Sequence, residues 1–297
     1  MTTLETGGLR DGYAELGDVR LHYVEAGDGP LVVLLHGFPE FWFGWRSQIP
    51  ALADAGFRVV APDMRGYNLS SRPADVEAYG TDRLAADVRD LIRQRGADRA
   101  FLAGHDWGGG VAWATAMNHP EVVERLAILN CPHPRRMLDA LRRPRQLARS
   151  WYMFVFQLPR LPERLARARG WSGLRHAFDD ARPGAFTQQD IAHYVEAWSQ
   201  PGAMTAMLNY YRAAFRQARS ARARTGQVHA PTLVIWGERD PHVGAELAEP
   251  DRADVPNLEG VERLPDASHW VQHDEAERVG RLLIEFFGGR AEREPAA

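Results

Sequence analysis

The chain has 297 residues, of which 45% are hydrophobic and 25% charged, and its formal net charge is −3. This composition is typical of an ordinary globular protein and argues against intrinsic disorder. All 36 basic residues are arginines, so Schiff-base catalysis, a pyridoxal phosphate anchor and a phosphate-loop lysine are excluded. Cys131 is the only cysteine, which excludes an intramolecular disulfide and a cysteine metal cluster.

The amino-terminal residues show neither the basic start nor the apolar run of a signal peptide. No stretch approaches about 18 uninterrupted apolar residues. We therefore expect a cytoplasmic protein without a membrane partner. The sequence leaves open whether it is a monomer or a homodimer.

The charge is unevenly distributed along the chain. Residues 133–224 hold 17 arginines and 6 acidic residues, a balance of +11 that leaves −14 for the remainder. Such a segment can bind an anionic partner or substrate, but helix faces exposed to solvent would also account for its positive charge.

Short apolar runs that end in polar or turn residues predict buried parallel strands in the first half of the chain. They are residues 31–35, 57–61, 100–103 and 126–129. Residues 82–95 have helical spacing, with Thr81 as the expected N-cap and Gly96 after the last turn. The alternation of strands with helical segments predicts a doubly wound, mostly parallel sheet with right-handed crossovers. Ahead of it, two alternating runs around Gly17 and Asp18 predict an antiparallel hairpin.

The pattern changes after Cys131. Residues 133–224 contain no convincing strand, only helical segments that are rich in arginine and aromatic residues and are interrupted by prolines. Strand-like runs return at residues 232–236 and 261–264, before an amphipathic helix at about residues 275–287. We therefore predict a core domain formed by residues 1–132 and 225–297, with a helical cap inserted at residues 133–224.

Residues 104–110, Gly-His-Asp-Trp-Gly-Gly-Gly, follow a predicted strand and have the pattern of a nucleophile elbow centred on Asp106. A strand that turns sharply into a helix strains its central residue, and only small neighbours permit the close approach. The amides at the helix N-terminus would point toward this side chain. In isolation, the segment is also explained by an N-cap aspartate with packing glycines.

Asp240 and His269 supply the partners that favour the catalytic interpretation. Asp240 lies in Gly-Glu-Arg-Asp after the strand at residues 232–236, and His269 lies in Ser-His-Trp after the strand at residues 261–264. A lone loop aspartate or histidine is usually structural. Nucleophile, acid and histidine nevertheless follow one another in the order that a nucleophile elbow requires, so we predict a catalytic triad.

The segment His-Gly-Phe-Pro-Glu, from His36 onward, follows the strand at residues 31–35. We expect the amide of Phe38 to form an oxyanion hole together with the amide of Trp107, which follows the nucleophile directly. We also place His36, Phe38, Pro39 and Trp107 at the substrate, with His36 bracing the loop. A tight strand-to-loop turn without a catalytic role is the alternative.

The segments His-Gly-Phe-Pro-Glu, Gly-His-Asp-Trp-Gly-Gly, Gly-Glu-Arg-Asp and Ser-His-Trp occur in this order around a helical insertion. Together they resemble the epoxide hydrolases of the α/β-hydrolase superfamily, which are relatives of the haloalkane and fluoroacetate dehalogenases. The resemblance covers nearly the whole chain. It implies an α/β-hydrolase fold, with a mostly parallel eight-stranded sheet flanked by helices and an inserted cap.

Epoxide hydrolases place two tyrosines from the lid over the nucleophile, where they hydrogen-bond the ring oxygen. The resemblance assigns these roles to Tyr152, five residues before Gln157, and to Tyr211, while its neighbour Tyr210 does not match the motif. A phenol with a pKa near ~10 stays protonated at neutral pH yet can give a proton to a developing alkoxide. Aromatic packing between cap helices is the alternative.

The mechanism that follows begins with attack of the ionised carboxylate of Asp106 on an epoxide carbon. His269, oriented by Asp240, then activates a water that hydrolyses the alkyl ester and releases a diol. The expected partners are a small epoxide and water, without a metal or organic cofactor, and we expect a role in detoxification.

Other functions fit the sequence less well. In a haloalkane dehalogenase, Trp107 would bind the halide, but Phe38 occupies the usual position of the second polar donor. Fluoroacetate dehalogenases carry arginines just after the nucleophile, where this chain has Trp107 and Gly110.

Non-enzymatic functions also fit less well. Because all the proposed catalytic residues are present, a protein that binds a ligand in its pocket without turnover is disfavoured. The sequence pI of about 6.4 and the lack of a nucleic-acid motif argue against a nucleic-acid partner.

Overall fold

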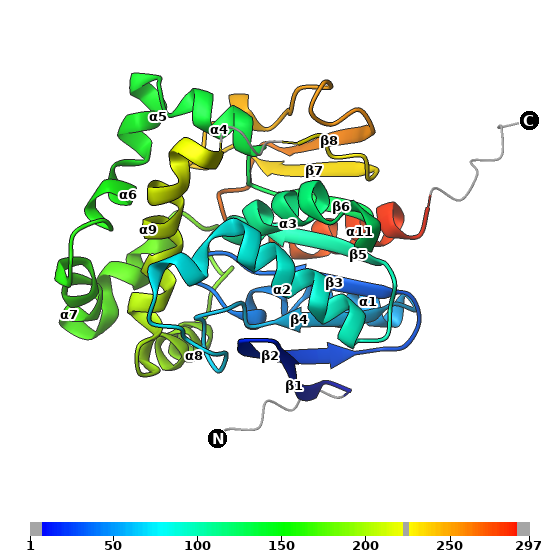
Figure 1. The fold of residues 1–297 in the computed structure, drawn as a ribbon, viewed down its shortest axis with the longest axis horizontal. Helices are drawn as coiled ribbons and strands as arrows, with labels where there is room; N and C mark the ends of the chain where they lie inside the picture. The colour runs from blue at the N-terminus through cyan, green and yellow to red at the C-terminus, as the bar shows by residue number, and fades with distance from the viewer. Residues whose placement is uncertain (1–7, 222–225, 290–297) are drawn as a thin grey trace, which may run out of the picture.

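The computed structural model describes residues 8–221 and 226–289. These residues form one eight-stranded sheet covered by helices, with a further group of helices beside one end of the sheet (Figure 1). The strands are β1 (Arg10–Leu16), β2 (Val19–Ala26), β3 (Leu31–Leu35), β4 (Arg58–Pro62), β5 (Ala100–His105), β6 (Val123–Leu129), β7 (Thr232–Gly237) and β8 (Leu258–Leu264). Their order is β1-β2-β4-β3-β5-β6-β7-β8.

Strand β2 is antiparallel to both of its neighbours, β1 and β4, and the other pairs are parallel. The predicted amino-terminal hairpin and the predicted mostly parallel sheet are therefore confirmed. Because parallel strands end at the same edge of a sheet, the loops after β3, β5, β6, β7 and β8 lie near one another.

Helices α2 and α3 pack together on one face of the sheet, and α1 and α11 pack together on the other (Figure 1). The core helices are α1 (Gln48–Asp54), α2 (Thr81–Gln94), α3 (Trp107–Asn118), α10 (Val271–Asp274) and α11 (Ala276–Phe287). The short 3₁₀ helices are η1 (Trp42–Trp45), η2 (Val76–Tyr79), η3 (Pro120–Val122), η4 (His176–Phe178) and η6 (Ala245–Leu247).

The two ends of α2 test the predictions that Thr81 is the N-cap and that the helix stops at Gly96. The helix begins at Thr81, so the prediction that Thr81 is the N-cap is wrong; Gly80 occupies that position in an extended conformation and offers no side chain. At the other end, Gly96 has a φ of +76°, the left-handed conformation that a glycine adopts without steric cost. The predicted stop at Gly96 is confirmed.

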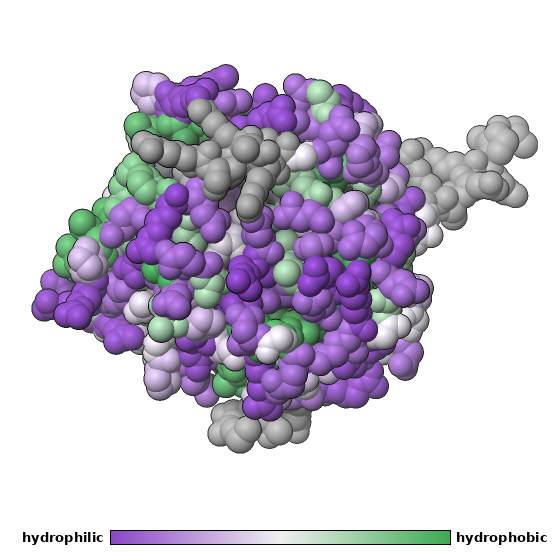
Figure 2. Space-filling model, viewed as in Figure 1, coloured by the Kyte–Doolittle hydropathy of each residue, from purple (hydrophilic) through white to green (hydrophobic). Residues whose placement is uncertain are grey.

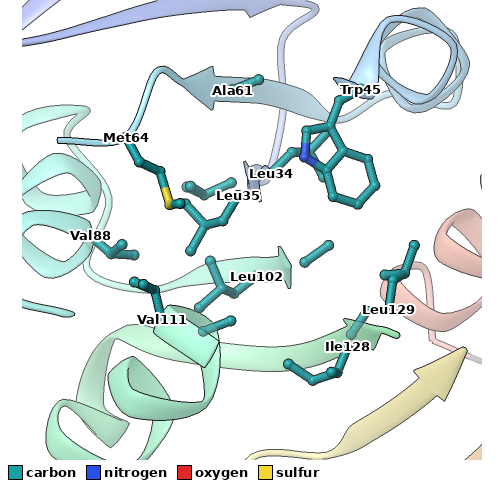
Figure 3. Packing of buried hydrophobic residues seen from close by; sticks show 14 of the residues in the cluster. Leu34, Leu35, Trp45, Ala61, Met64, Val88, Leu102, Val111, Ile128 and Leu129 are labelled. Carbon is teal, nitrogen blue, oxygen red and sulfur yellow. The ribbon is translucent and has the colours of Figure 1, made fainter. Parts of the chain in front are cut away.

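The central strands are buried on both faces, which is why their sequences read as continuous apolar runs. Leu34, Leu35, Leu102, Ile128 and Leu129 expose no surface and interlock with side chains from the flanking helices (Figure 3). Burying one such side chain contributes roughly 1.5–3 kcal/mol. This core fixes the strand ends from which the site is built.

A helical insertion, at the place where the cap was predicted and called the cap below, follows β6 and precedes β7. Its helices are α4 (Pro134–Ala140), α5 (Pro144–Arg149), α6 (Trp151–Val155), α7 (Leu161–Arg175), α8 (Gln188–Ser199) and α9 (Ala203–Ala221). As far as residue 221, the insertion contains helices and loops and no strand. The predicted boundary between residues 224 and 225 lies outside the described residues.

Candidate active site

Asp106 lies between the end of β5 and the start of α3, with φ 50° and ψ −120°. This conformation is unfavourable for a residue with a side chain, and such strain is concentrated at functional sites. Its neighbours must be small. A Cβ added to Gly104 would lie 2.3 Å from the carbonyl oxygen of Gly108, and one added to Gly108 would lie 2.2 Å from that of Leu35. The elbow predicted from the glycine pattern is present.

The structure brings the predicted triad together from three strand ends. His269 Nδ1 lies 2.7 Å from Asp240 Oδ2, and His269 Nε2 lies 3.7 Å from Asp106 Oδ2. Asp240 follows β7 and His269 follows β8, so both partners reach Asp106 across the carboxyl edge of the sheet. The histidine is therefore held between two carboxylates.

Asp240 is buried among hydrogen-bond donors. Its Oδ1 accepts from the amides of His242 (2.7 Å) and Val243 (2.9 Å), and its Oδ2 accepts from Asn130 Nδ2 (2.8 Å). Burial raises the pKa of this carboxyl, but the charge and hydrogen bond of His269, together with these donors, lower it to about 2. Asp240 therefore stays ionised throughout the neutral range.

Asn130 is a site residue that the sequence did not reveal. It follows β6 directly, has a φ of 42°, and its Oδ1 accepts from the amide of Gly237 at 2.8 Å. Asparagine tolerates this left-handed conformation better than most residues. The available signal was its position, since it is a polar residue immediately after a predicted parallel strand, as Asp106 is.

The environment of His269 favours its charged form. Burial lowers its pKa, but the carboxylate of Asp240, followed by those of Asp106 and Asp180, raises it to about 9. At neutral pH the resting site therefore holds a protonated imidazole between Asp106 and Asp240. Removing either negative charge would lower the pKa of His269.

The two oxygens of Asp106 have different surroundings. Oδ1 accepts a hydrogen bond from the amide of Phe38 at 2.8 Å, whereas Oδ2 is the oxygen nearer to His269. Phe38 is thus placed as the predicted oxyanion-hole donor requires. Trp107 is the first residue of α3 and follows Asp106 directly, so its amide is the second candidate donor.

Tyr152 on α6 and Tyr211 on α9 both line the cavity above Asp106, with their ring centroids 6.0 Å apart. Burial, reinforced by the charge of Asp106, raises the pKa of both phenols, so both stay protonated. Tyr210 instead points into the core, where its hydroxyl donates to the carbonyl oxygen of Arg65 at 2.7 Å. The structure therefore distinguishes the two neighbours as the motif suggested.

A cavity of about 400 Å³ joins these groups. Its wall is mostly apolar and comes from both core and cap. The lining residues are Phe38, Pro39, Asp106, Trp151, Tyr152, Val155, Phe156, Pro162, Leu165, Ala166, Gly173, Leu174, His176, Ala177, Met204, Tyr211, His242, His269 and Trp270. Phe38 and Pro39 thus lie where substrate contact was predicted. An apolar cavity with a few convergent polar groups is typical of a small-molecule site.

Two residues predicted at the substrate do not line this cavity. His36 is fully buried beneath the loop, where its Nε2 accepts from the amide of Met64 at 3.0 Å. It braces the loop as predicted, but the prediction of substrate contact is not supported. The indole of Trp107 packs edge-on against Tyr210 and Tyr211, and Trp107 is not among the residues that line the cavity.

His242 is a cavity residue that the sequence did not suggest. Its ring centroid lies 5.3 Å from that of His269 and 5.8 Å from that of Tyr152. Burial, followed by the charge of His269, lowers its pKa. A neutral imidazole therefore lies beside the reacting groups.

A buried network beneath the site connects the loop after β3 with the cap. Glu40 Oε1 accepts from Tyr194 on α8 (2.8 Å) and lies 2.7 Å from His273 Nε2. Its Oε2 lies 3.3 Å from His105 Nδ1, and His105 Nε2 lies 2.9 Å from the carbonyl oxygen of His269. This network ties the backbone of His269 to the loop that carries Phe38.

Within residues 8–221 and 226–289, no group of three or more His, Cys, Asp or Glu side chains is arranged to hold a metal ion. In the same ranges, no helix has the length and apolar character needed to cross a bilayer.

A strained carboxylate between a strand and a helix, with an acid and a histidine at the ends of later strands of the same sheet, defines the class of α/β hydrolases. Residues 30–276 match the family described as alpha/beta hydrolase fold, and the chain belongs to this family. The predicted fold is confirmed.

Individual relatives and solved structures show which members of this family the chain resembles. The chain is 42% identical over 283 residues to AB hydrolase superfamily protein YfhM of Bacillus subtilis, covering 94% of this chain and 98% of that protein. It is 38% identical over 285 residues to epoxide hydrolase 4 of Mus musculus, covering 93% of this chain and 78% of that protein. The crystal structure of an epoxide hydrolase from Bacillus megaterium with an inhibitor matches with a TM-score of 0.86 and 34% identity, over 94% of this chain and all of that one. The predicted resemblance to epoxide hydrolases is confirmed.

Proposed function

We propose that this protein hydrolyses epoxides to vicinal diols through a covalent ester on Asp106. The observation that carries the proposal is the asymmetry of this carboxylate. Its Oδ1 is occupied by the amide of Phe38, while its Oδ2 lies toward His269, in a cavity roofed by Tyr152 and Tyr211. One oxygen is thus held and the other is available to attack.

In the first step, Oδ2 of Asp106 bonds to a ring carbon and the carbon–oxygen bond of the epoxide breaks. The departing oxygen needs a proton as it gains charge, and Tyr152 or Tyr211 supplies it. The raised pKa of both phenols keeps that proton in place until an alkoxide, which is a much stronger base, develops. A carboxylate needs no base to become a nucleophile.

Ester formation changes the electrostatics at His269. The ester carries no charge, so one of the carboxylates that raise the pKa of His269 is lost. The pKa of His269 falls, which favours transfer of its proton to the tyrosinate that the first step leaves behind. His269 is then a neutral base for the second step, oriented by Asp240 through the 2.7 Å hydrogen bond.

In the second step, His269 takes a proton from water, and the resulting hydroxide attacks Cγ of Asp106. The negative charge develops on Oδ1, where the amide of Phe38 already donates, with the amide of Trp107 as second donor. The ester bond breaks, the departing alkoxide takes the proton of the newly formed carboxyl group, and the diol leaves, while His269 keeps the proton that it took from water, which restores the ion pair. The cycle consumes one epoxide and one water.

The experiment that tests this function uses His269→Gln. We expect the variant to form the ester with an aryl epoxide but to hydrolyse it slowly, so that mass spectrometry finds the Asp106 peptide heavier by the mass of the epoxide. In the wild type, a single turnover in heavy-oxygen water should place the label in Asp106. An unmodified Asp106 peptide in the variant, or label found only in the diol, would contradict the covalent mechanism.

A haloalkane or haloacetate dehalogenase that uses the same aspartate is the alternative. A panel of epoxides, alkyl halides and fluoroacetate separates these activities, and we expect turnover of the epoxides. The apolar side chain of Phe38 at the cavity supports this expectation, because it cannot hydrogen-bond a halide. A cytoplasmic location and a role in detoxification remain predictions from the sequence.

A further inference from the structure

Exposed apolar side chains gather on one part of the cap. Nine large hydrophobic residues are exposed in the described chain, and seven of them belong to the cap. Six lie between residues 147 and 165, on α5, on α6, in the turn after α6 and at the start of α7, and form what we call the cap patch: Leu147, Trp151, Phe154, Leu158, Leu161 and Leu165. Figure 2 shows hydrophobic side chains at the edge of the molecule where Figure 1 places α6 and α7. Large apolar side chains that gather on one part of a protein surface often mark an interaction site.

The surroundings of the cap patch are basic. Residues 140–178 contain nine arginines and one acidic residue, Glu163. Glu163 is buried, with Oε1 2.9 Å from Arg212 Nη1, so its charge is not presented at the surface. Eight of the nine arginines are exposed: Arg142, Arg143, Arg145, Arg160, Arg164, Arg167, Arg169 and Arg175. The excess positive charge of the insertion is thus concentrated around its exposed apolar side chains.

The cap patch also borders the proposed active site. Trp151 is 63% exposed and Leu165 is 56% exposed, yet both line the cavity that contains Asp106. The catalytic His269, by contrast, is buried. The open side of the cavity therefore coincides with the edge of the cap patch, and a molecule held at this surface is next to the entrance.

We propose that the cap patch docks on the surface of an anionic phospholipid bilayer and that lipophilic epoxides pass from the bilayer into the cavity. Aromatic and leucine side chains flanked by arginines are the composition of an interfacial membrane-binding surface, because the apolar groups enter the headgroup boundary while the arginines meet anionic lipids. Docking of this kind needs no spanning helix. Membrane docking departs from the expectation, drawn from the sequence, of no membrane partner. The delivery of epoxides to the cavity rests on the proposed function, whereas the docking of the cap patch does not.

Two other occupants fit the cap patch less well. A second copy that met it face to face would bring two arginine-rich surfaces together, and like charges oppose such a contact. A nucleic acid would use the arginines, but aliphatic side chains such as Leu158 and Leu161 offer no stacking platform for bases. An anionic bilayer satisfies both the charge and the apolar surface.

The docking test measures co-flotation of the protein with phospholipid vesicles in the absence of substrate. We expect binding to vesicles of phosphatidylcholine with phosphatidylglycerol, and much weaker binding to phosphatidylcholine alone. Arg164→Glu with Arg167→Glu should lower the partition coefficient at least about tenfold, because each arginine near an anionic surface strengthens binding several-fold. Phe154→Ser with Leu161→Ser should lower it as well, and neither residue lines the cavity.

The chain supplies matched controls on the core domain. Tyr13 and Leu69 are 43% and 45% exposed, against 45% and 44% for Phe154 and Leu161, so Tyr13→Ser with Leu69→Ser is the apolar control. The charge control is Arg93→Glu with Arg281→Glu, whose ion pairs are exposed and contribute little to stability. Both controls should bind vesicles as the wild type does.

Several outcomes would overturn the docking proposal. They are a wild type that does not float with anionic vesicles, controls that lose as much binding as the cap variants, and a dimer in sedimentation that the apolar cap variant dissociates. The last outcome would assign the cap patch to a second copy. Preferential binding of a DNA duplex over vesicles would assign it to a nucleic acid.

The passage of epoxides from the bilayer into the cavity is tested separately, with two epoxides. For a long-chain alkyl epoxide dissolved in anionic vesicles, the apolar cap variant should turn over about tenfold more slowly than the wild type. For a small water-soluble epoxide, the two rates should agree. Equal rates on the vesicle-bound epoxide would refute delivery. If the wild type opens neither epoxide, the proposed function fails, while the flotation result still decides whether the cap patch docks.

Discussion

Asp106 and Tyr152 line the same cavity, but the core and the cap hold these residues by different means. Asp106 is fixed by a strained backbone, by close glycine contacts and by the amide of Phe38. Tyr152 belongs to the five-residue helix α6, none of whose residues is fully buried, and it is held by aromatic contacts with Phe156, Tyr211 and His242. We infer that the core holds Asp106 in one fixed geometry, whereas the cap forms a more adaptable wall of the cavity.

The helices around the cavity show the same contrast. Helix α3 is regular from its first residue, and eight of its twelve residues are buried. Helix α7 is interrupted by non-helical residues from Ala168 to Trp171, and four of its fifteen residues are buried. We infer that chemistry depends on the core, and that substrate choice and access depend on the cap. Four predictions, ordered from the largest expected effect, test this division.

Replacing the nucleophile should have the largest effect. Asp106→Ala should lower kcat/KM for an aryl epoxide by at least about 10⁴-fold, because the remaining groups cannot form the ester. The free energy of unfolding should fall by about 1–3 kcal/mol, because alanine keeps a Cβ at the strained position and loses the hydrogen bond from the amide of Phe38 and the ion pair with His269. Diol formation and chemical denaturation measure the two quantities. Substantial diol formation by a correctly folded variant would contradict the assignment of Asp106.

The cap tyrosines should contribute less. Tyr152→Phe and Tyr211→Phe should each slow ester formation by about 10² to 10⁴-fold, the usual range for loss of a general acid. Tyr210→Phe is the matched control, because its hydroxyl donates to the carbonyl oxygen of Arg65 away from the cavity. It should lower stability slightly and leave the single-turnover rate unchanged. A larger kinetic effect at Tyr210 than at Tyr211 would reverse the assignment.

Alanine substitutions at one glycine of the core and one of the cap compare how tightly the two regions are packed. Gly108→Ala should lower the free energy of unfolding by about 3 kcal/mol or more, because the added Cβ would meet the carbonyl oxygen of Leu35 at 2.2 Å. Gly173→Ala on α7 should be neutral or stabilising by up to about 1 kcal/mol, since its nearest contact would be 3.8 Å away. Denaturant titrations measure both changes. Similar values for the two variants would contradict the contrast between the domains.

The pH dependence of stability should report the charged state of His269. Its pKa is raised in the folded protein to about 9, so its stabilising contribution is complete below the unfolded value and is lost as the pH rises from about 6.5 to 9. The wild type should therefore lose about 2–3 kcal/mol relative to His269→Gln over this range. Denaturation of both proteins at several pH values measures the difference. A difference that is constant with pH would show that His269 is neutral in the resting site.

The sequence by itself determined those features that depend on neighbouring residues. Apolar runs located the strands, and the flanking glycines identified Asp106, since they are required within a few residues of it. Asp240 and His269 were found because each follows a strand, and the ends of parallel strands meet at one edge of the sheet. Tyr211 was separated from Tyr210 by its motif alone.

Only the tertiary structure decided the features that join distant parts of the chain. Asn130 reaches Asp240 because β6 and β7 are adjacent in the sheet, and His242 approaches His269 because the loops that carry them follow the adjacent strands β7 and β8. The same long-range packing buried His36 beneath its loop. It also left the apolar side chains of the cap patch exposed, which no periodicity in the sequence indicates. Local patterns indicate which segments form strands and helices, whereas contacts between elements depend on how the whole chain packs.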